Sequence, residues 1–221
     1  MAKLVITIDG PAGSGKSSTA KLLASKIDAA FLDTGAMYRA AALAAMRAGC
    51  KLDDVSALEK IIDNTKFKFE IAAGQMAVKI DGSDVTEKIR DPNVTANVQF
   101  IASEPSLRQR LVKMQRAFAG ERQKIVTEGR DQGTVVFPDA DFKFFLTAQP
   151  EVRTKRRAAE LTEKGLNVDT GKLQREIEKR DMSDKNRKTA PLAAAKDAVI
   201  IDNTDLTLEQ TVSRILEVVK F

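Results

Sequence analysis

The residues Gly10-Pro11-Ala12-Gly13-Ser14-Gly15-Lys16-Ser17 form the most informative stretch of this 221-residue sequence. They fit the pattern G-x-x-x-x-G-K-[ST] of a phosphate-binding loop. Residues 3–8, before the loop, are apolar and β-branched, which predicts a buried strand. Residues 18–27, after it, carry leucine and isoleucine at helical spacing, which predicts a helix. Strand, glycine-rich loop and helix therefore follow one another in the order that the motif requires.

A loop of this kind binds phosphate with its backbone. Its glycines let successive N–H groups point inward at a polyphosphate, and the following helix adds the positive end of its dipole. We expect the Lys16 ammonium to reach the β- and γ-phosphates and the Ser17 hydroxyl to bind Mg²⁺. The alternative, a glycine-rich turn with a chance lysine, leaves the agreement of motif and context unexplained.

Composition and charge are typical of a globular protein with an anionic ligand. The chain is 43% hydrophobic and 30% charged, and its length suits one large α/β domain or a domain with a small insert. Its net charge is +5, but no block of consecutive Lys or Arg resembles a nucleic-acid-binding arm, so we expect no nucleic-acid partner. The absence of histidine excludes a histidine base, a histidine metal ligand and a Ser-His-Asp triad.

The cysteine count and the first apolar run bear on where the protein works. Cys50, which we expect to be a partly buried helix residue, is the only cysteine, so no internal disulfide framework can form. The run Leu4–Ile8 is too short for a signal peptide or a membrane span. We expect a cytoplasmic protein without a membrane partner, and nothing in the sequence requires more than a monomer.

The next segment predicts a second strand followed by a helix. Phe31-Leu32 is the expected strand, and the helix is expected over residues 36–48, with Thr34 as its cap and Gly49 at its end. Arg39 lies in the second turn, near the carboxyl end of that strand, where ligands bind in open α/β sheets. A solvated helix charge is the alternative. A further helix is predicted over residues 53–64.

Residues 66–85 change the period of the hydrophobic pattern from helical to alternating. Two alternating runs are separated by Gly74, and Asp81-Gly82 is a hairpin signal, with Val85 in an expected third short strand. These residues predict a small antiparallel insert. The pattern itself does not distinguish a decorative hairpin from a flap over an acceptor substrate.

The central part of the sequence predicts two helices, over 91–103 and 104–119, and a core strand at Ile125-Val126-Thr127. The second helix carries a basic run that we assign mostly to a solvated face, formed by Arg108, Arg110, Lys113 and Arg116. After the strand, Arg130-Asp131 stands between two glycines. An arginine fork for phosphate and a carboxylate for a base amino group or sugar hydroxyl is the favoured interpretation, and a local ion pair is the alternative.

The last third predicts a strand at Phe142–Leu146, a helix that starts at Pro150, a strand at Ala198–Ile201 and a closing helix over 208–219. Between them, another helix runs from about Asp169 until Pro191 stops it. Each of the two helices between these strands presents charged residues on one face, Arg153, Arg156 and Arg157 on the first, and Arg180, Asp184 and Arg187 on the second. A clamp for polyphosphate and an ordinary charged surface both remain open.

The number of arginines favours phosphoryl transfer between two phosphorylated molecules. Such a reaction needs negative charge neutralised and the two reacting oxygens held in line. A plain ATPase or GTPase needs no acceptor pocket, and the guanine-reading motif Asn-Lys-x-Asp is missing from the sequence. A sugar or shikimate acceptor carries no phosphate, so fewer arginines would be expected.

The sequence resembles the bacterial-type cytidylate kinases, which are P-loop nucleoside monophosphate kinases. The resemblance covers nearly the whole chain, and its most specific parts are Asp33–Arg39 and Gly129–Ala140. The loop stretch Ile6–Ser17, the pairs Arg180-Asp181 and Asn186-Arg187, and Ala190-Pro191-Leu192 also agree. The resemblance implies transfer of the γ-phosphoryl group of ATP to CMP or dCMP with Mg²⁺.

The same resemblance implies an α/β P-loop NTPase three-layer fold with a five-stranded parallel sheet. One kinase domain over 1–221 would comprise a core (1–62, 86–150 and 190–221), a β insert over the monophosphate (63–85) and a helical lid (151–189). The residues implied for ATP are Gly10, Pro11, Ala12, Gly13, Ser14, Gly15, Lys16, Ser17 and Ser18.

For the acceptor, the resemblance implies that Thr34, Arg108 and Asp131 contact the cytosine. Phosphate would be held by Arg39, Arg130 and Arg187, and the sugar by Arg180 and Asp184, while Lys16, Arg130, Arg157 and Arg187 are the expected catalytic residues. Gln99 stands where a serine near the sugar is expected, and Gln132 where a methionine is expected. The preference between CMP and dCMP therefore stays open.

Two alternatives to this function remain. One is a kinase for another monophosphate such as UMP or AMP, which the base-contacting residues would distinguish. The other is a nucleotide-regulated binding module for RNA, supported only by the pI of about 9.3. One tyrosine and no tryptophan leave such a module little surface for base stacking.

Overall fold

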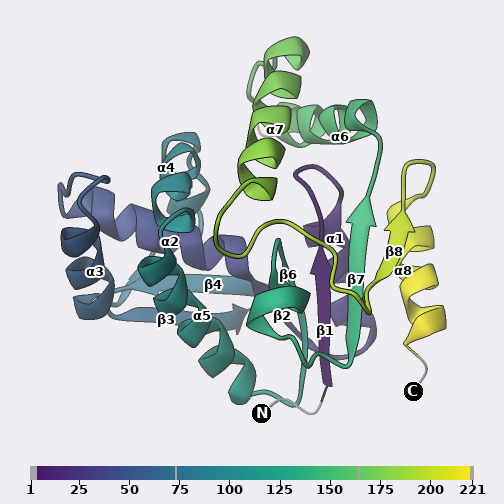
Figure 1. Ribbon diagram of the computed structural model, residues 1–221, viewed down its shortest axis with the longest axis horizontal. Helices are drawn as coiled ribbons and strands as arrows, with labels where there is room; N and C mark the ends of the chain where they lie inside the picture. The colour runs from purple at the N-terminus through teal and green to yellow at the C-terminus, as the bar shows by residue number, and fades with distance from the viewer. Residues whose placement is uncertain (1–3, 73, 164, 220–221) are drawn as a thin grey trace. The chain divides into compact units, whose positions relative to one another are not determined.

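The computed structural model describes residues 4–72, 74–163 and 165–219, and these ranges form an α/β protein with two sheets (Figure 1). Lys3, predicted as the start of the first strand, lies outside the described residues. The larger sheet has five parallel strands in the order β2-β6-β1-β7-β8, and the smaller has three antiparallel strands in the order β3-β4-β5. The larger sheet consists of β1 (Leu4–Asp9), β2 (Ala30–Asp33), β6 (Lys124–Gly129), β7 (Phe142–Thr147) and β8 (Val199–Asp202). The expected fold class is confirmed.

The chain divides into two compact units. Among the described residues, the first unit comprises 30–125, and the second comprises 4–29 and 126–219. Each unit has its own packed helices and is described separately below. The division into core, insert and lid, which the family resemblance implies, stays a prediction.

The second unit contains the predicted strand–loop–helix at its start. Strand β1 is buried through Ile6 and Ile8, as its apolar β-branched residues require. Helix α1 (Lys16–Lys26) packs against α8 (Leu208–Val218), and α6 (Pro150–Glu163) packs against α7 (Thr170–Lys185) (Figure 1). Helix α8 begins at a capping box in which Thr207 and Gln210 bond each other's backbone N–H groups. The predicted strands and helix starts of this unit are confirmed.

Helix α7 ends earlier than the sequence predicts. We expected Pro191 to stop it, but its last residue is Lys185 and Asn186 is its C-cap. The Asp184 carbonyl accepts a hydrogen bond from the Leu192 N–H at 2.8 Å, so the returning chain satisfies this carbonyl and no further turn is needed. Arg187 therefore lies beyond the helix. A π-helical turn, η2 (Gln132–Val136), which we did not predict, follows β6.

The first unit is built around α2 (Thr34–Arg47), a helix that is buried along most of its length. Tyr38, Ala41 and Ala45 pack in one cluster with residues of α3 (Val55–Asn64), α4 (Pro92–Ala102) and α5 (Pro105–Gly120). The small alanine side chains allow this close approach. The predicted helices are confirmed within one or two residues, and Gly49, with a φ of 64°, follows α2 as expected. Cys50 is half-buried as predicted, but it lies after the helix and not in it.

The cap of α2 is Asp33 and not Thr34. The Asp33 carboxylate accepts from the Ala36 N–H at 2.8 Å, and Thr34 is the first residue of the helix. A carboxylate at this position satisfies an N–H group that has no partner within the helix and also faces the positive end of the helix dipole. The helix therefore begins one residue earlier than a threonine cap would place it.

The predicted antiparallel insert is confirmed as β3 (Phe67–Ala72), β4 (Gln75–Ile80) and β5 (Ser83–Asp84). Asp81 and Gly82 both have positive φ, the conformation of a two-residue hairpin turn. Val85 lies just past β5, although its N–H still bonds the Val78 carbonyl at 2.9 Å. A short 3₁₀ turn, η1 (Lys88–Arg90), leads from the insert to α4. None of the helices in the described ranges is long and apolar enough to span a membrane.

Candidate active site

The glycine-rich loop of the second unit joins the end of β1 to the start of α1. The N-cap of α1 is Gly15, which has no side chain to bond the first N–H groups of the helix. The Ser14 hydroxyl is buried and makes no hydrogen bond to any residue that the structure describes. Uncapped helix N–H groups and a buried hydroxyl without a partner fit an anionic ligand with several oxygens. The loop thus has the chemistry expected for a nucleotide polyphosphate.

The loop is held from both sides at Ala12. The Ala12 N–H donates to Asp181 at 3.0 Å, and the Ala12 carbonyl accepts from Arg153 at 2.9 Å. Arg153 and Asp181, which are both buried, also form an ion pair with each other. A side chain on Gly13 would place its Cβ 2.7 Å from the Arg153 carbonyl oxygen, so only glycine fits there. Helices α6 and α7 therefore grip the loop directly.

The three arginines that the sequence places on one face of α6 have different partners. Arg153 belongs to the grip on Ala12, and Arg156 donates to the side chain of Asn203 at 2.9 Å and to its carbonyl at 2.7 Å. Asn203 in turn donates to the Ser14 carbonyl at 2.9 Å. Arg157 is partly exposed and pairs with Glu160. Two of the three thus support the loop, and the predicted catalytic role of Arg157 stays a prediction.

Lys16 is buried within the loop that it belongs to. It is 6% exposed, and its ammonium donates to the Pro11 carbonyl at 3.0 Å. Burial lowers the pKa of Lys16 to about 7, and the nearby Arg130 and Arg180 guanidiniums act in the same direction. A phosphate would reverse this effect, because an anion stabilises the charged ammonium.

Arg130 and Arg187 converge on Asp184. The Arg130 Nε donates to one Asp184 carboxylate oxygen at 2.7 Å, and an Arg187 Nη lies 3.1 Å from the other. Burial alone would raise the pKa of Asp184, but Arg130, Arg187 and Arg180 together hold it below its usual value. Three of the predicted arginines of this unit, Arg130, Arg180 and Arg187, thus act on one carboxylate, although Arg187 pairs with it from beyond the helix.

Asp131 and Asp9 are buried beside the same cluster. Asp131 is 4% exposed, and the Arg130 Nε bonds Asp184. The interpretation of Arg130-Asp131 as a phosphate fork with a carboxylate stays a prediction. Asp9, at the end of β1, accepts from the Gln132 and Gly133 N–H groups at 2.9 and 2.8 Å. We did not predict a role for Asp9. Its position directly before the glycine-rich loop is the only sequence signal that could have indicated one.

In the first unit, Arg39 and Arg90 converge on Asp33. Arg39 lies 3.2 Å and Arg90 3.5 Å from the same carboxylate oxygen. The Nε of Arg39 is buried without a hydrogen-bond partner among the described residues, as expected of a guanidinium that awaits an anion. Gly35 lies under this guanidinium, since a Cβ there would come within 2.9 Å of it. Asp33 and Arg90 were not among the predicted site residues.

Arg108 is the exception in the basic run that we assigned mostly to a solvated face, since Lys113 and Arg116 are exposed. It is 4% exposed, donates to the Ala102 carbonyl at 3.1 Å and lies 5.6 Å from the centre of the Tyr38 ring. Arg110 does lie on the outer surface and pairs with Asp63. The two remaining residues predicted for the acceptor differ in burial, because Thr34 is buried at the start of α2 and Gln99 is exposed on α4.

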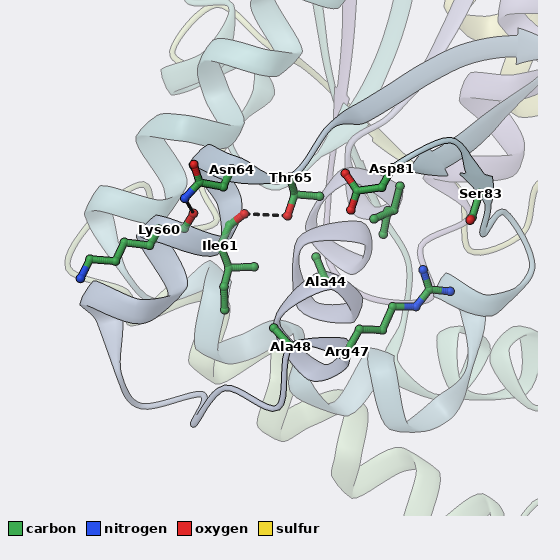
Figure 2. Close-up of a pocket in the computed structure, with 10 residues that line it drawn as sticks. Ala44, Arg47, Ala48, Lys60, Ile61, Asn64, Thr65, Asp81 and Ser83 are labelled. Atoms are coloured by element: carbon green, nitrogen blue, oxygen red, sulfur yellow. Dashed lines mark hydrogen bonds between the residues drawn. The ribbon is translucent and has the colours of Figure 1, made fainter.

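A hollow of about 470 Å³ in the first unit lies apart from the predicted residues (Figure 2). It is lined by Ala44, Arg47, Ala48, Lys60, Ile61, Asn64, Thr65, Ile80, Asp81 and Ser83. Figure 2 shows Arg47 reaching towards Ser83, while Lys60 points away from the opening. The Asn64 amide and the Thr65 hydroxyl bond carbonyls of their own helix. No residue predicted for the site lines this hollow, and we do not assign the site to it.

Comparison with known proteins agrees with this chemistry. The sequence model of one family, described as cytidylate kinase, matches residues 6–221. The chain belongs to the cytidylate kinase family. A cytidylate kinase of Caldicellulosiruptor saccharolyticus is 46% identical over 217 residues, which cover 98% of this chain and 96% of that protein. Those of Ligilactobacillus salivarius and Haemophilus ducreyi are 43% and 42% identical over similar lengths.

Solved structures support the fold of this cytidylate kinase family member at much lower identity. A shikimate kinase from Bacteroides thetaiotaomicron aligns with a TM-score of 0.51 at 14% identity, over 99% of each chain. An uncharacterised protein from Eubacterium ventriosum aligns with a TM-score of 0.52 at 15% identity, over 99% of this chain and 98% of that one. At such identities the likeness concerns the fold alone.

Proposed function

We propose that this protein transfers the γ-phosphoryl group of ATP to CMP or dCMP, giving CDP or dCDP and ADP. The observation that carries the proposal is a cationic cluster beside a phosphate-binding loop in a member of the cytidylate kinase family. Lys16, Arg130 and Arg187 lie in this cluster with Asp184. Phosphoryl transfer depends mainly on such charge neutralisation and on positioning, with little covalent help from the protein.

For the donor, we propose that residues 10–18 hold the ATP phosphates. The Ser14 hydroxyl and the first N–H groups of α1 are available to phosphate oxygens, and Lys16 would bind the β- and γ-phosphates. Ser17 is exposed in the first turn of α1, so its hydroxyl suits a magnesium ion whose other ligands are phosphate oxygens and water. A bound Mg²⁺ would neutralise part of the phosphate charge.

For the acceptor, we propose roles by chemical type. Arg39 and Arg90 of the first unit, and Arg130 and Arg187 of the second, are guanidiniums suited to phosphate. The residues proposed for the base and sugar are Thr34, Gln99, Arg108, Asp131, Arg180 and Asp184. Arg108 is held rigidly by its contacts with Ala102 and Tyr38, as a residue that reads a base edge should be.

A substrate panel tests the function. ADP release would be measured with Mg²⁺, ATP and each of CMP, dCMP, UMP, AMP, GMP and dTMP in turn. We expect turnover with CMP and dCMP and little with the others. Preference for another monophosphate would support a kinase activity but refute the roles proposed for the base-contacting residues. No turnover with any acceptor would refute the proposal.

The panel also tests Gln99. Its exposed amide could bond a ribose hydroxyl. A Gln99→Ser variant would then change the ratio of kcat/KM for CMP to kcat/KM for dCMP, with little change in thermal stability.

We further propose that the protein is a monomer in the cytoplasm. Its single cysteine is in keeping with a reducing compartment. Light scattering at enzyme concentrations used in the assay would test the monomer.

A further inference from the structure

Asp9 makes a connection that the proposed chemistry does not use directly. It is the last residue of β1 and is 3% exposed. One carboxylate oxygen accepts from the Gln132 N–H at 2.9 Å and the other from the Gly133 N–H at 2.8 Å. These two N–H groups follow directly after Arg130 and Asp131. A single carboxylate thus joins the strand that leads into the ATP loop to the turn that carries two proposed acceptor residues.

The same turn also contacts strands β1 and β6. A Cβ at Gly133 would lie 3.0 Å from the Thr7 hydroxyl, so the backbone here lies directly against β1. The Gln132 side chain accepts from the Thr127 hydroxyl at 2.9 Å. Gln132 and Gly133 are buried, so both N–H groups need an acceptor, and Asp9 supplies it.

We propose that Asp9, as a carboxylate, is a positioning residue that fixes the turn bearing Arg130 and Asp131, and that its protonation loosens this turn. A carboxylate can accept from both N–H groups at once. A protonated carboxyl has one oxygen that is itself a donor, so one of the two hydrogen bonds weakens. The inference rests on the proposed function, since its effect is on the use of CMP.

The environment of Asp9 places this change near neutral pH. Burial raises the pKa of Asp9 to about 7, and Asp131 acts in the same direction, while the two N–H bonds and Arg130 oppose the rise. On the neighbouring strand β7, the Lys143 ammonium is paired with Asp197 at 2.7 Å. The turn is therefore expected to be tightly held above pH 7 and less so below it.

The test compares wild type with Asp9→Asn. Asparagine has the same size and shape as aspartate, but its NH₂ group replaces one of the two carboxylate oxygens that accept a backbone N–H bond. The ratio of their kcat/KM values for CMP would be measured from pH 5.5 to 9, so that ionisation of the substrates cancels. We expect a ratio near one below about pH 6 that rises to about tenfold or more above pH 8, with a midpoint near 7. A ratio that does not change with pH would overturn the inference.

A measurement on the wild-type protein keeps the inference testable if the variant is unstable. In the wild-type protein, the amide resonances of Gln132 and Gly133 should titrate together with a midpoint near pH 7, and pH-independent resonances would overturn the inference. Binding of Mg-ATP to Asp9→Asn should stay within about threefold of wild type. If Asp9→Asn weakened Mg-ATP binding as much as it lowered kcat/KM for CMP, Asp9 would act on the glycine-rich loop and not on the turn, and the inference would be overturned. A wild type that phosphorylates no monophosphate at any pH would refute the proposed function and not this inference.

Discussion

At the scale of single residues, Lys16 is the group whose charge depends most on what it binds. Its pKa is lowered to about 7 by burial and then by Arg130 and Arg180, while Glu128 and Asp184 oppose the shift, so its charge changes near neutral pH. A polyphosphate beside the amine favours the ammonium form and raises the pKa. Binding of ATP is therefore coupled to uptake of a proton.

We predict that Mg-ATP binding at pH 8 takes up nearly one proton, and markedly less at pH 6, where Lys16 is already charged. Titration calorimetry in buffers of different ionisation enthalpy would measure the number directly. Lys16→Met should bind ATP more weakly and without this uptake. An unchanged proton number in that variant would assign the uptake to another group.

Asp33 combines two functions that one substitution can separate. It caps α2 through the Ala36 N–H and it holds Arg39 and Arg90. Asparagine is as good an N-cap as aspartate, but it lacks the charge that positions the two guanidiniums.

We predict that Asp33→Asn raises the KM for CMP about tenfold, while the midpoint of thermal unfolding changes by less than about 3 °C. The matched control is Asp54→Asn, because Asp54 caps α3 through the Ala57 N–H and has no arginine partner in the described residues. It should change neither quantity appreciably. Equal effects of the two substitutions on KM would show that Asp33 acts only as a cap.

The sequence was most informative where the interacting residues are neighbours along the chain. The loop that contains Lys16 and Ser17 could be predicted because its motif is contiguous, and the turn at Asp81-Gly82 because these residue types tolerate the positive φ found there. The cap of α2 could not be assigned, since Asp33 and Thr34 are both capping types and the choice depends on where the strand ends. Asp9 and Asp181 were missed because their partners lie 123 and 169 residues away in the sequence.

At the scale of elements, the two helices α6 and α7 support the ATP loop through one peptide unit. Arg153 comes from α6 and Asp181 from α7, and they bond the carbonyl and the N–H of Ala12 as well as each other. Periodicity predicted both helices and put Arg153 on a charged face, but it left open whether that face is a polyphosphate clamp or an ordinary surface. Side-chain spacing shows which residues share a face and not what that face contacts. The end of α7 likewise depends on a residue outside the helix, since the Leu192 N–H donates to the Asp184 carbonyl.

We predict that Asp181→Asn and Arg153→Met each weaken Mg-ATP binding, and that the double variant binds no more weakly than the worse single one. Their coupling free energy should be about 1 kcal/mol or more, because both act through the same peptide unit. Calorimetry or fluorescence of a labelled nucleotide would supply the four binding constants. The exposed pair of Arg110 and Asp63 is the control, and its variants should leave ATP binding unchanged. If the effects of the Arg153 and Asp181 substitutions on the free energy of Mg-ATP binding were simply additive, the two residues would not act through the Ala12 peptide together.

At the scale of the whole molecule, the proposed ATP residues lie in one unit, whereas the proposed acceptor residues lie in both. The loop with Lys16 and Ser17 belongs entirely to the second unit, whereas Asp33, Arg39 and Arg108 belong to the first. Each of these groups is assembled by contacts within its own unit. A ligand that binds a unit opposes its local opening, because the bound state adds free energy that opening must overcome.

We predict that the two substrates slow amide hydrogen exchange in different parts of the chain. A non-hydrolysable ATP analogue with Mg²⁺ should protect peptides that include residues 10–20. CMP should protect peptides that include 33–39 and 105–112, together with the turn at 130–133.

The size of the effect follows from the ligand concentration. At about one hundred times Kd, the bound ligand stabilises its site by about 2.7 kcal/mol. Exchange then slows about a hundredfold wherever opening requires release of the ligand. UMP and AMP at the same concentration are the controls for the base-contacting residues. If either nucleotide protected residues 105–112, Arg108 would not be a residue that recognises cytosine. If CMP protected no peptide of the first unit, Asp33, Arg39 and Arg108 could not be acceptor residues, and the acceptor would have to be sought in the second unit alone.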